Sequence, residues 1–305
     1  MDVGVMVNVA DQAGLGGVVD QVRSVADAGI RSAWLPQVFG IDALTAVAVA
    51  GREVPGITLG TAVVPTWPRH PMVLAGQALT TQAATGGRLV LGVGLSHQLV
   101  IEGMMGIPFQ RPAHHMREYL TVLRALVHEG TVDFTGDTLR ATTMVGPFRV
   151  PDAEPFPILV AALGPALLRL AGELSEGTLT WMAGRSVVEG RIVPSITEAA
   201  AAAGRPAPQV VVGLPVAVTA DVDAARERAA RQYATYGNLP SYRRLLDEEK
   251  VDGPADVAIA GDEETVTARI RGFFDAGATG FIAAPFGSAP ERQATLRFLG
   301  QLAQS

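Results

Sequence analysis

Short apolar runs alternate with longer amphipathic runs along the whole chain. β-Branched residues dominate the short runs, and the longer runs carry apolar residues at helical spacing. Strands are predicted at residues 3–9, 32–35, 57–64, 89–93, 157–161, 177–181, 210–218 and 280–284. Helices are predicted at residues 18–28, 42–52, 72–84, 113–127, 166–174, 186–203, 221–236, 263–276 and 291–302. Strands that alternate with helices form a parallel sheet, and eight such units in 305 residues predict an α/β protein, a closed (β/α)8 TIM barrel.

Three stretches fall outside this alternation. Residues 98–111 and 238–252 are irregular, and residues 131–150 have the pattern of a β-hairpin with its turn at Gly136 and Asp137. No linker divides the chain, so residues 1–305 are predicted to form a single barrel domain with insertions at these three places.

In a barrel of this kind the active site lies at the carboxyl ends of the strands. The predicted strands end in a mainly apolar and aromatic set with a few hydroxyls and amides. Its members are Asn8, Gln37, residues 63–67, Ser96, His97, Leu163, Gly164, Thr180, Trp181 and Phe286. Such a set suits a planar organic cofactor that brings its own reactivity. Arg69 and His70, which come after the third strand, are assigned to the start of the next helix.

Charge and cysteine content exclude several classes of function. The net charge is −6 with both signs interspersed and no basic block, so neither a nucleic acid nor an anionic membrane surface is predicted as a partner. The absence of cysteine rules out disulfides and thiolate chemistry and fits a cytoplasmic location. The first residues, MDVGVMVNVADQ, lack the basic start of a signal peptide, and no apolar run is long enough to span a membrane.

Metal-assisted and Schiff-base chemistry are also disfavoured. The five histidines are scattered, and the predicted strand ends carry almost no acidic residue and no lysine. We therefore predict no metal site. His97 is the titratable side chain that remains at a strand end, and it is the first candidate for a catalytic residue.

Two places could hold the phosphate of a cofactor. Gly164 and Pro165 start a helix whose first amides are free, and Gly177 to Thr180 form a strand rich in glycine and threonine. A Gly-Pro helix start that binds nothing is the plain alternative. Gly92 and Gly94 are only a fragment of a dinucleotide-binding motif. The three tryptophans could pack the barrel rim or, as at Trp181, make a flat wall for a ring system.

The order of several motifs resembles the bacterial luciferase-like flavin monooxygenases, and more closely their branch that uses the deazaflavin coenzyme F420. The motifs span nearly the whole chain. They read AGIRSAWLPQ (28–37), GTAVVPTWPRHP (60–71), TGGRLVLGVGLSH (85–97), RPAHHMREYLTVLRAL (111–126), PILVAALGPALLRLAGELSEGTLTW (157–181) and GNLPSYRRLLDEEKVDGPADVAIAGDEE (237–264). The resemblance implies an oxidoreductase on a (β/α)8 barrel that transfers a hydride between coenzyme F420 and a small organic substrate.

The resemblance also implies a β-bulge with a non-prolyl cis peptide near Thr61, Ala62 and Val63, where the backbone supports the central ring of the cofactor. It implies that Gln37 faces this ring and that Ser96 and His97 lie beside it. The phosphate side is implied at Ala162, Leu163, Gly164, Gly177, Thr178 and Leu179. Some relatives carry His or Asp where this chain has Gln37, so His97 and Gln37 are the candidate catalytic residues, and no strong general acid is carried over.

Two other functions stay open at this point. One is an FMN-dependent monooxygenase of the same superfamily, and the other is a non-catalytic barrel that binds a flavin. In both, as in the F420 hypothesis, a small molecule would bind at the barrel mouth. Barrels of this type often pair through their outer helices, so a homo-oligomer is expected, with a dimer favoured.

Overall fold

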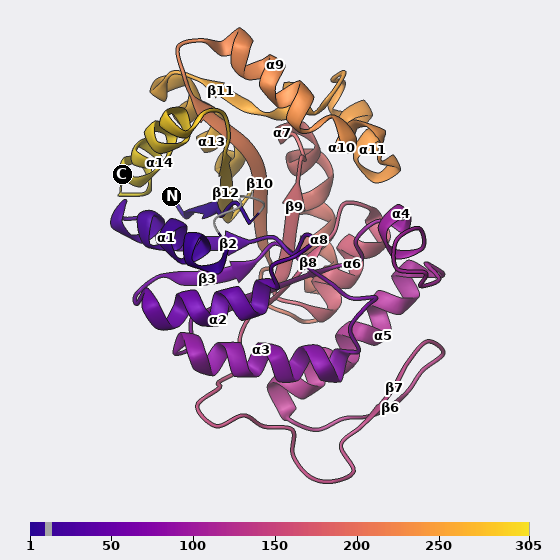
Figure 1. The fold of residues 1–305 in the computed structure, drawn as a ribbon. Helices are drawn as coiled ribbons and strands as arrows, with labels where there is room; N and C mark the ends of the chain where they lie inside the picture. Colours follow the sequence, from indigo (N-terminus) through magenta and orange to yellow (C-terminus); the bar gives the residue numbers. More distant parts are fainter. Residues whose placement is uncertain (10–13, 305) are drawn as a thin grey trace.

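The centre of the molecule is a closed ring of parallel strands, seen in a computed structural model that describes residues 1–9 and 14–304 (Figure 1). Within these residues the ring has eight strands, as the sequence predicts. In ring order they are β1 (Val3–Met6), β2 (Ser32–Leu35), β3 (Thr58–Thr61), β5 (Leu89–Gly94), β8 (Ile158–Ala161), β9 (Gly177–Trp181), β10 (Gln209–Val218) and β12 (Gly280–Pro285). The ring closes where β12 pairs with β1, and its order follows the order along the chain.

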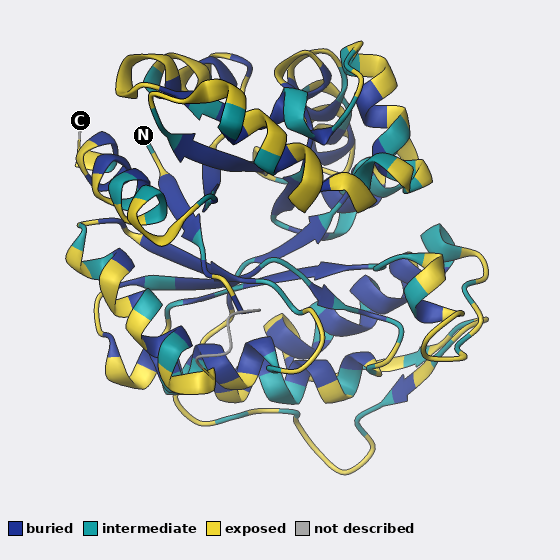
Figure 2. Ribbon diagram, turned by 45° about the horizontal axis from the view of Figure 1, so that its top comes forward, coloured by how far each residue is buried: buried dark blue, intermediate teal, exposed yellow. Residues whose placement is uncertain are grey.

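Helices surround the ring and turn their apolar faces toward it. Figure 2 shows the buried residues on the inner faces of the outer helices and the exposed residues on their outer faces. The main helices are α1 (Gly14–Asp27), α2 (Ala43–Glu53), α3 (Pro71–Thr85), α5 (Pro112–Arg124), α6 (Pro165–Leu174), α8 (Val193–Ala202), α9 (Val222–Gln232), α13 (Glu263–Asp275) and α14 (Ala289–Gln304). Helices of the described residues are all too short or too polar to cross a membrane.

Several elements differ from the predicted ranges. The helix predicted at 186–203 is broken into α7 (Arg185–Val187), a π-helical turn η2 (Val188–Ile192) and α8, and α5 likewise continues into a π-helical turn η1 (Ala125–Glu129). The strand predicted at 57–64 is divided into β3 and the short β4 (Val64–Pro65), which pairs with β5, and the short strand β11 (Ile259–Gly261), which pairs with β10, was not predicted. β11 has three residues, which is too short for a periodic pattern to show.

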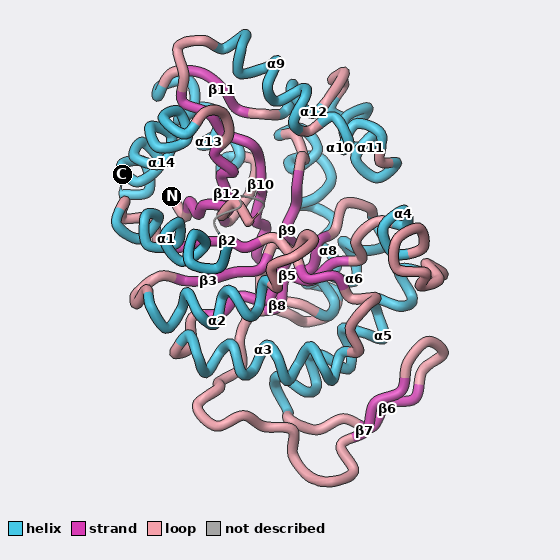
Figure 3. Tube along the Cα trace, viewed as in Figure 1, coloured by secondary structure: helices cyan, strands magenta, loops and turns pink. Residues whose placement is uncertain are grey.

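The three segments outside the alternation have structure of their own. Residues 98–111 begin with α4 (Gln98–Ile101), and residues 238–252 are mostly helical, with α10 (Ala234–Asn238) leading into α11 (Pro240–Glu249). The hairpin consists of β6 (Asp133–Thr135) and β7 (Arg140–Thr142), antiparallel as predicted. Figure 3 shows this hairpin apart from the barrel strands, whereas α10 and α11 lie at the same end of the molecule as α4.

Side chains cap the helices at the strand-to-helix turns. The Asp42 carboxylate accepts the amide of Thr45 at the start of α2, and the Asp221 carboxylate does the same for Ala224 at the start of α9. His70 Nδ1 accepts the amide of Met72 at the start of α3. Arg69 forms an ion pair with Asp42. The assignment to the start of α3 is therefore confirmed for His70, whereas Arg69 pairs with the cap of α2.

The barrel interior is filled at its amino-terminal half by one large side chain. Trp34 lies over Gly60 of the neighbouring strand, where a Cβ atom would come within 2.2 Å of the indole ring. Its Nε1 donates to the hydroxyl of Ser32 at 3.1 Å. Residues from four other strands complete this floor of the barrel: Leu159, Leu179, Val211 and Ile282. All of them are at most 6% exposed, so the floor is closed to solvent.

Gly92 allows β3 and β5 to approach each other, and this closeness generates a prediction. A Cβ atom at Gly92 would lie 2.1 Å from the carbonyl oxygen of Thr61, a backbone atom that cannot move aside. We expect Gly92→Ala to lower the free energy of unfolding by about 1–3 kcal/mol. Gly190, whose Cβ position is open, is the matched control, and Gly190→Ala should be neutral or stabilising by up to about 1 kcal/mol. Chemical denaturation of both variants checks this, and equal stability would contradict it.

Candidate active site at the barrel mouth

The third strand breaks at its carboxyl end, at the place where a bulge was expected. β3 stops at Thr61 and β4 resumes at Val64, and the peptide between Ala62 and Val63 is cis. The fully buried hydroxyl of Thr61 takes the place of the backbone hydrogen bonds to β5 that are interrupted here. It donates to the Gly92 carbonyl at 2.8 Å and accepts from the Gly92 amide at 2.9 Å. The wall of the barrel therefore stays closed although its backbone pairing is interrupted.

Above the floor the interior is open to solvent. The inward residues Ala62, Val63, Ala161 and Trp181 are all partly exposed, in contrast to the buried layer beneath them. Their neighbours on the wall include Gly94, where a Cβ atom would come within 2.7 Å of Val63. The result is an accessible apolar surface at the carboxyl ends of the strands, with the interrupted third strand on one side.

Ser96 and His97 lie where β5 leaves the barrel. Ser96 has a φ of 59°, in the left-handed region, which turns the chain toward α4. His97 precedes α4 without capping it through its side chain, and its ring centroid is 5.8 Å from that of Tyr242. Burial lowers the pKa of His97 below its ordinary value of 6.5. At neutral pH the imidazole is therefore uncharged and suited to accepting or donating a hydrogen bond.

Gln37 organises the loop after β2. Its Nε2 donates to the carbonyls of Val38 and Ile41 at 3.3 and 3.4 Å, and its Oε1 accepts the amide of Ala43 at 2.7 Å. Both ends of the amide are thus engaged at the start of α2. Gln37 follows the carboxyl end of β2, and its role toward a cofactor or in catalysis stays a prediction.

The start of α6 has the features expected of an anion site. Ala162 is buried, whereas Leu163 and Gly164 are partly exposed after the end of β8. Gly164 is the N-cap, Pro165 is the first helical residue, and the first turn has no acidic residue and no side-chain cap. The positive end of the helix dipole is therefore available to an anion.

The other three predicted phosphate contacts lie on β9, next to β8. Gly177 begins β9, where a Cβ atom would come within 2.1 Å of the Gln209 carbonyl oxygen. The Thr178 hydroxyl donates to the Val160 carbonyl at 2.8 Å and lies 3.5 Å from the Ala162 carbonyl oxygen, and Leu179 pairs in register with Ala161. Their role toward a phosphate stays a prediction.

A cluster of aromatic side chains lies at the mouth, and the sequence reasoning missed the three tyrosines in it. Ring contacts of 5.0–6.1 Å connect its members across the mouth from the end of β5 to the end of β12. They are His97, Tyr242, Tyr236, Trp181, Tyr233 and Phe286, and we call this group the aromatic cluster. One signal was present in the sequence: three of the four tyrosines lie within residues 233–242.

Trp67 packs the rim. Its ring is stacked on that of His115, with centroids 3.8 Å apart and planes 7° apart, and His115 Nε2 lies 3.1 Å from the Thr66 hydroxyl. Burial lowers the pKa of His115 to about 4, against the opposing effect of the Glu118 charge. The stacked rings of Trp67 and His115 join the loop after β4 to α5. Trp67 therefore has the rim-packing role that the sequence left open for the tryptophans.

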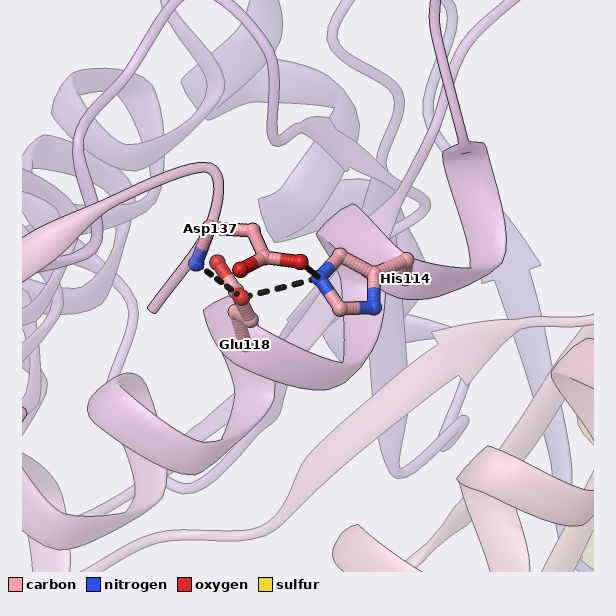
Figure 4. A group of neighbouring side chains, drawn as sticks. All are labelled: His114, Glu118 and Asp137. Atoms are coloured by element: carbon pink, nitrogen blue, oxygen red, sulfur yellow. Dashed lines mark hydrogen bonds and ion pairs between the residues drawn. The ribbon is translucent and has the colours of Figure 1, made fainter. Parts of the chain in front are cut away.

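One group of side chains has the composition of a metal site, but its contacts are those of a structural clasp. His114, Glu118 and Asp137 lie together where the hairpin meets α5 (Figure 4). His114 Nε2 is 2.9 Å from Glu118 Oε1 and 3.2 Å from Asp137 Oδ2. The Glu118 carboxylate also accepts the amides of Asp137 and Thr138 at 2.7 and 2.8 Å. Its oxygens are thus occupied in holding the hairpin turn.

Comparisons with known proteins show the family of the chain. The family model described as luciferase-like monooxygenase matches residues 1–280. A putative coenzyme F420-dependent oxidoreductase of Mycobacterium tuberculosis is 33% identical over 169 residues, which are 52% of this chain and 49% of that protein. A 5,10-methylenetetrahydromethanopterin reductase of Methanopyrus kandleri is 24% identical over 92% of this chain and 91% of its own.

The same fold is present in a solved structure. The coenzyme F420-dependent tetrahydromethanopterin reductase from Methanopyrus kandleri superposes with a TM-score of 0.83, at 22% identity over 98% of this chain and 97% of that one. At 22% sequence identity the match supports the fold alone. The 98% of the chain that is matched includes the barrel and the segments that connect its strands and helices.

The clasp at Glu118 gives a prediction for pH and stability. Burial acts to raise the pKa of Glu118, but hydrogen bonds from Thr138 and Asp137 and the nearby His114 outweigh it and lower the pKa from 4.5 to about 2. A folded-state pKa below the unfolded value contributes stability above pH 4.5, and this contribution is lost as the pH falls toward 2. We expect Glu118→Gln to lose about 1–3 kcal/mol at pH 7 and to show less acid-dependent loss of stability.

Urea denaturation at a series of pH values measures both effects. Glu198 is exposed on α8, so Glu198→Gln is the control and should follow the wild-type curve. A Glu118→Gln variant as stable as the wild type at pH 7 would show that the clasp contributes nothing.

Proposed function

Because the chain belongs to the luciferase-like monooxygenase family, we propose that it is an oxidoreductase that transfers a hydride between coenzyme F420 and a small organic substrate. The observation that carries the proposal is the interrupted third strand, which places Ala62 and Val63 above a closed floor and beside an accessible apolar surface. The names of the relatives, an F420-dependent oxidoreductase and a methylenetetrahydromethanopterin reductase, support the same coenzyme.

The residues at the mouth fit a flat, anionic cofactor. Ala62, Val63 and Ala161 supply small apolar contacts, and Trp181 supplies a flat face. Gly164 and the start of α6 would hold a phosphate group through backbone amides. Charged side chains are not needed at either place, which agrees with the uncharged composition of the strand ends.

When bound, coenzyme F420 supplies the carbon that donates or accepts the hydride. The chain itself would orient the ring and the substrate and keep water from the space between them. Ala62 and Val63 would support the ring from beneath, and the aromatic cluster would cover the mouth on the side of β9 and β12. His97, neutral and partly buried, could hydrogen-bond a substrate.

The runner-up is an FMN-dependent monooxygenase, because the family as a whole is named for that reaction. It would use the same bulge and apolar surface, so geometry alone favours neither coenzyme. A non-catalytic flavin-binding barrel is the third reading, and the naming of the relatives as enzymes weighs against it.

We also propose that residues 1–305 act as one barrel domain in which the segments 98–111 and 238–252 form the substrate side of the mouth. Their placement supports this, because His97 at the start of the first segment contacts Tyr242 in the second. A homodimer and a cytoplasmic location stay predictions, and light scattering of the purified protein checks the first.

Absorbance titration of the purified protein tests the choice of coenzyme. Binding of F420 in the micromolar range is expected, with FMN bound more weakly. No spectral change at high micromolar F420 would overturn the proposal, and tighter binding of FMN would favour the runner-up.

A large side chain on the accessible apolar surface of the mouth should weaken the binding of F420 without unfolding the protein. Ala161 lies at the end of β8 and points inward above Leu159, so Ala161→Phe places a ring where the cofactor would sit. We expect the affinity for F420 to fall at least about 10-fold with little change in melting temperature, because the side chain enters open space. Ala202→Phe on the exposed end of α8 is the control and should bind as the wild type does. Unchanged affinity in Ala161→Phe would place the cofactor elsewhere.

A further inference from the structure

The aromatic cluster contains three tyrosine hydroxyls, which a group that only covers the mouth would not need. Two of its tyrosines come from the segment that links α9 to α11 and the third, Tyr242, from α11 itself, and they meet side chains at the ends of three barrel strands. Tyr236 occupies the middle of the cluster, with ring centroids 6.1 Å from Trp181 and 5.0 Å from Tyr242. Both contacts are edge-to-face, at 65° and 80°, so neighbours on two sides hold the Tyr236 ring in position.

Tyr236 is also the best placed of the three tyrosines to meet a ligand. Tyr233 and Tyr242 are 8% and 9% exposed, and the Tyr233 hydroxyl already accepts a hydrogen bond from Gln232. Tyr236 is partly exposed, and among residues 1–9 and 14–304 no acceptor takes the proton of its hydroxyl. Burial raises the pKa of Tyr236 above its ordinary value of 10.0, so the phenol is protonated at neutral pH.

A buried donor, the indole N–H of Trp181, lies next to the same hydroxyl. It meets no other acceptor among the residues that the structure describes. Burial raises the pKa of Tyr236, and the interaction of its hydroxyl with Trp181 acts to lower it. A donor in this position stabilises the oxygen most when the phenol has given up its proton, because a charged acceptor strengthens the hydrogen bond.

The surroundings of Tyr236 select an uncharged ligand. The aromatic cluster carries no charged side chain, since His97 is neutral. On α11 the guanidinium of Arg243 is occupied by the Asp247 carboxylate at 2.8 Å and by the carbonyls of Val251 and Asp252. A carboxylate or phosphate on the substrate would therefore be desolvated here without a partner.

We propose that the Tyr236 hydroxyl binds the oxygen of a neutral carbonyl or alcohol substrate and exchanges a proton with it. The inference rests on the proposed function, which supplies the hydride. In reduction, the carbonyl carbon gains the hydride from the reduced coenzyme and the carbonyl oxygen takes the proton of Tyr236. The phenolate then accepts a hydrogen bond from the Trp181 N–H until solvent gives Tyr236 its proton back. In oxidation the steps run in reverse: solvent first takes the proton of Tyr236, and the phenolate then takes the proton of the alcohol while the alcohol carbon would give its hydride to the oxidised coenzyme.

The first test measures binding without turnover. Cyclohexanecarboxamide has a neutral carbonyl oxygen and is not reduced, so it serves as the probe, with its binding followed by tryptophan fluorescence of the F420-loaded protein. Tyr236→Phe keeps the ring and removes the hydroxyl. We expect the affinity for the amide to fall about 10-fold, as the loss of one hydrogen bond to a carbonyl predicts. Equal affinity in the variant overturns the inference, and so does a wild type that binds F420 but not the amide.

The second test measures the proton transfer. With cyclic ketones that the wild type reduces, Tyr236→Phe should lower kcat by about 100-fold or more and leave the affinity for F420 unchanged. Tyr119→Phe is the matched control, since Tyr119 is a fully buried residue of α5 outside the aromatic cluster, and it should keep the wild-type kcat. An unchanged kcat in Tyr236→Phe, or an equal loss in Tyr119→Phe, overturns the inference. Failure of the wild type to bind F420 would instead count against the proposed function.

Discussion

The hydroxyl of Thr61 is the contact on which the barrel mouth depends. The third strand must leave the sheet at Ala62 and Val63, and a gap there would expose backbone groups of β5 inside the wall. Thr61 occupies both the amide and the carbonyl of Gly92, and the small size of Gly92 makes the approach possible. The strand can therefore change direction at the mouth while buried polar groups remain satisfied.

The mouth is assembled in two layers of different origin. Its floor and wall come from strand residues that the closed ring holds in register, with Trp34 at the centre of the floor. Its cover comes from Tyr233, Tyr236 and Tyr242 on short helices that reach the mouth from outside the ring. The hairpin is fixed independently, through Glu118 on α5, so it can hold its place without contributing to the mouth.

The order of elements was predictable because each barrel strand is a short apolar run between turns. The strand ends pointed to Val63, Ser96, His97 and Trp181, and the family resemblance added Ala62. The tyrosines of the aromatic cluster could not be predicted, because the amphipathic pattern of α11 says which face is buried but not what lies against it.

The two-layer mouth has a consequence for how such a protein can diverge. The floor and the wall tolerate little change, since Gly60 and Gly92 leave no space for a side chain. The short helices α10 and α11 lie outside the ring of strands, so exchanges there leave the register of the barrel untouched. Related proteins could thus acquire new substrate ranges through substitutions in α10 and α11 while the barrel strands beneath the mouth stay the same.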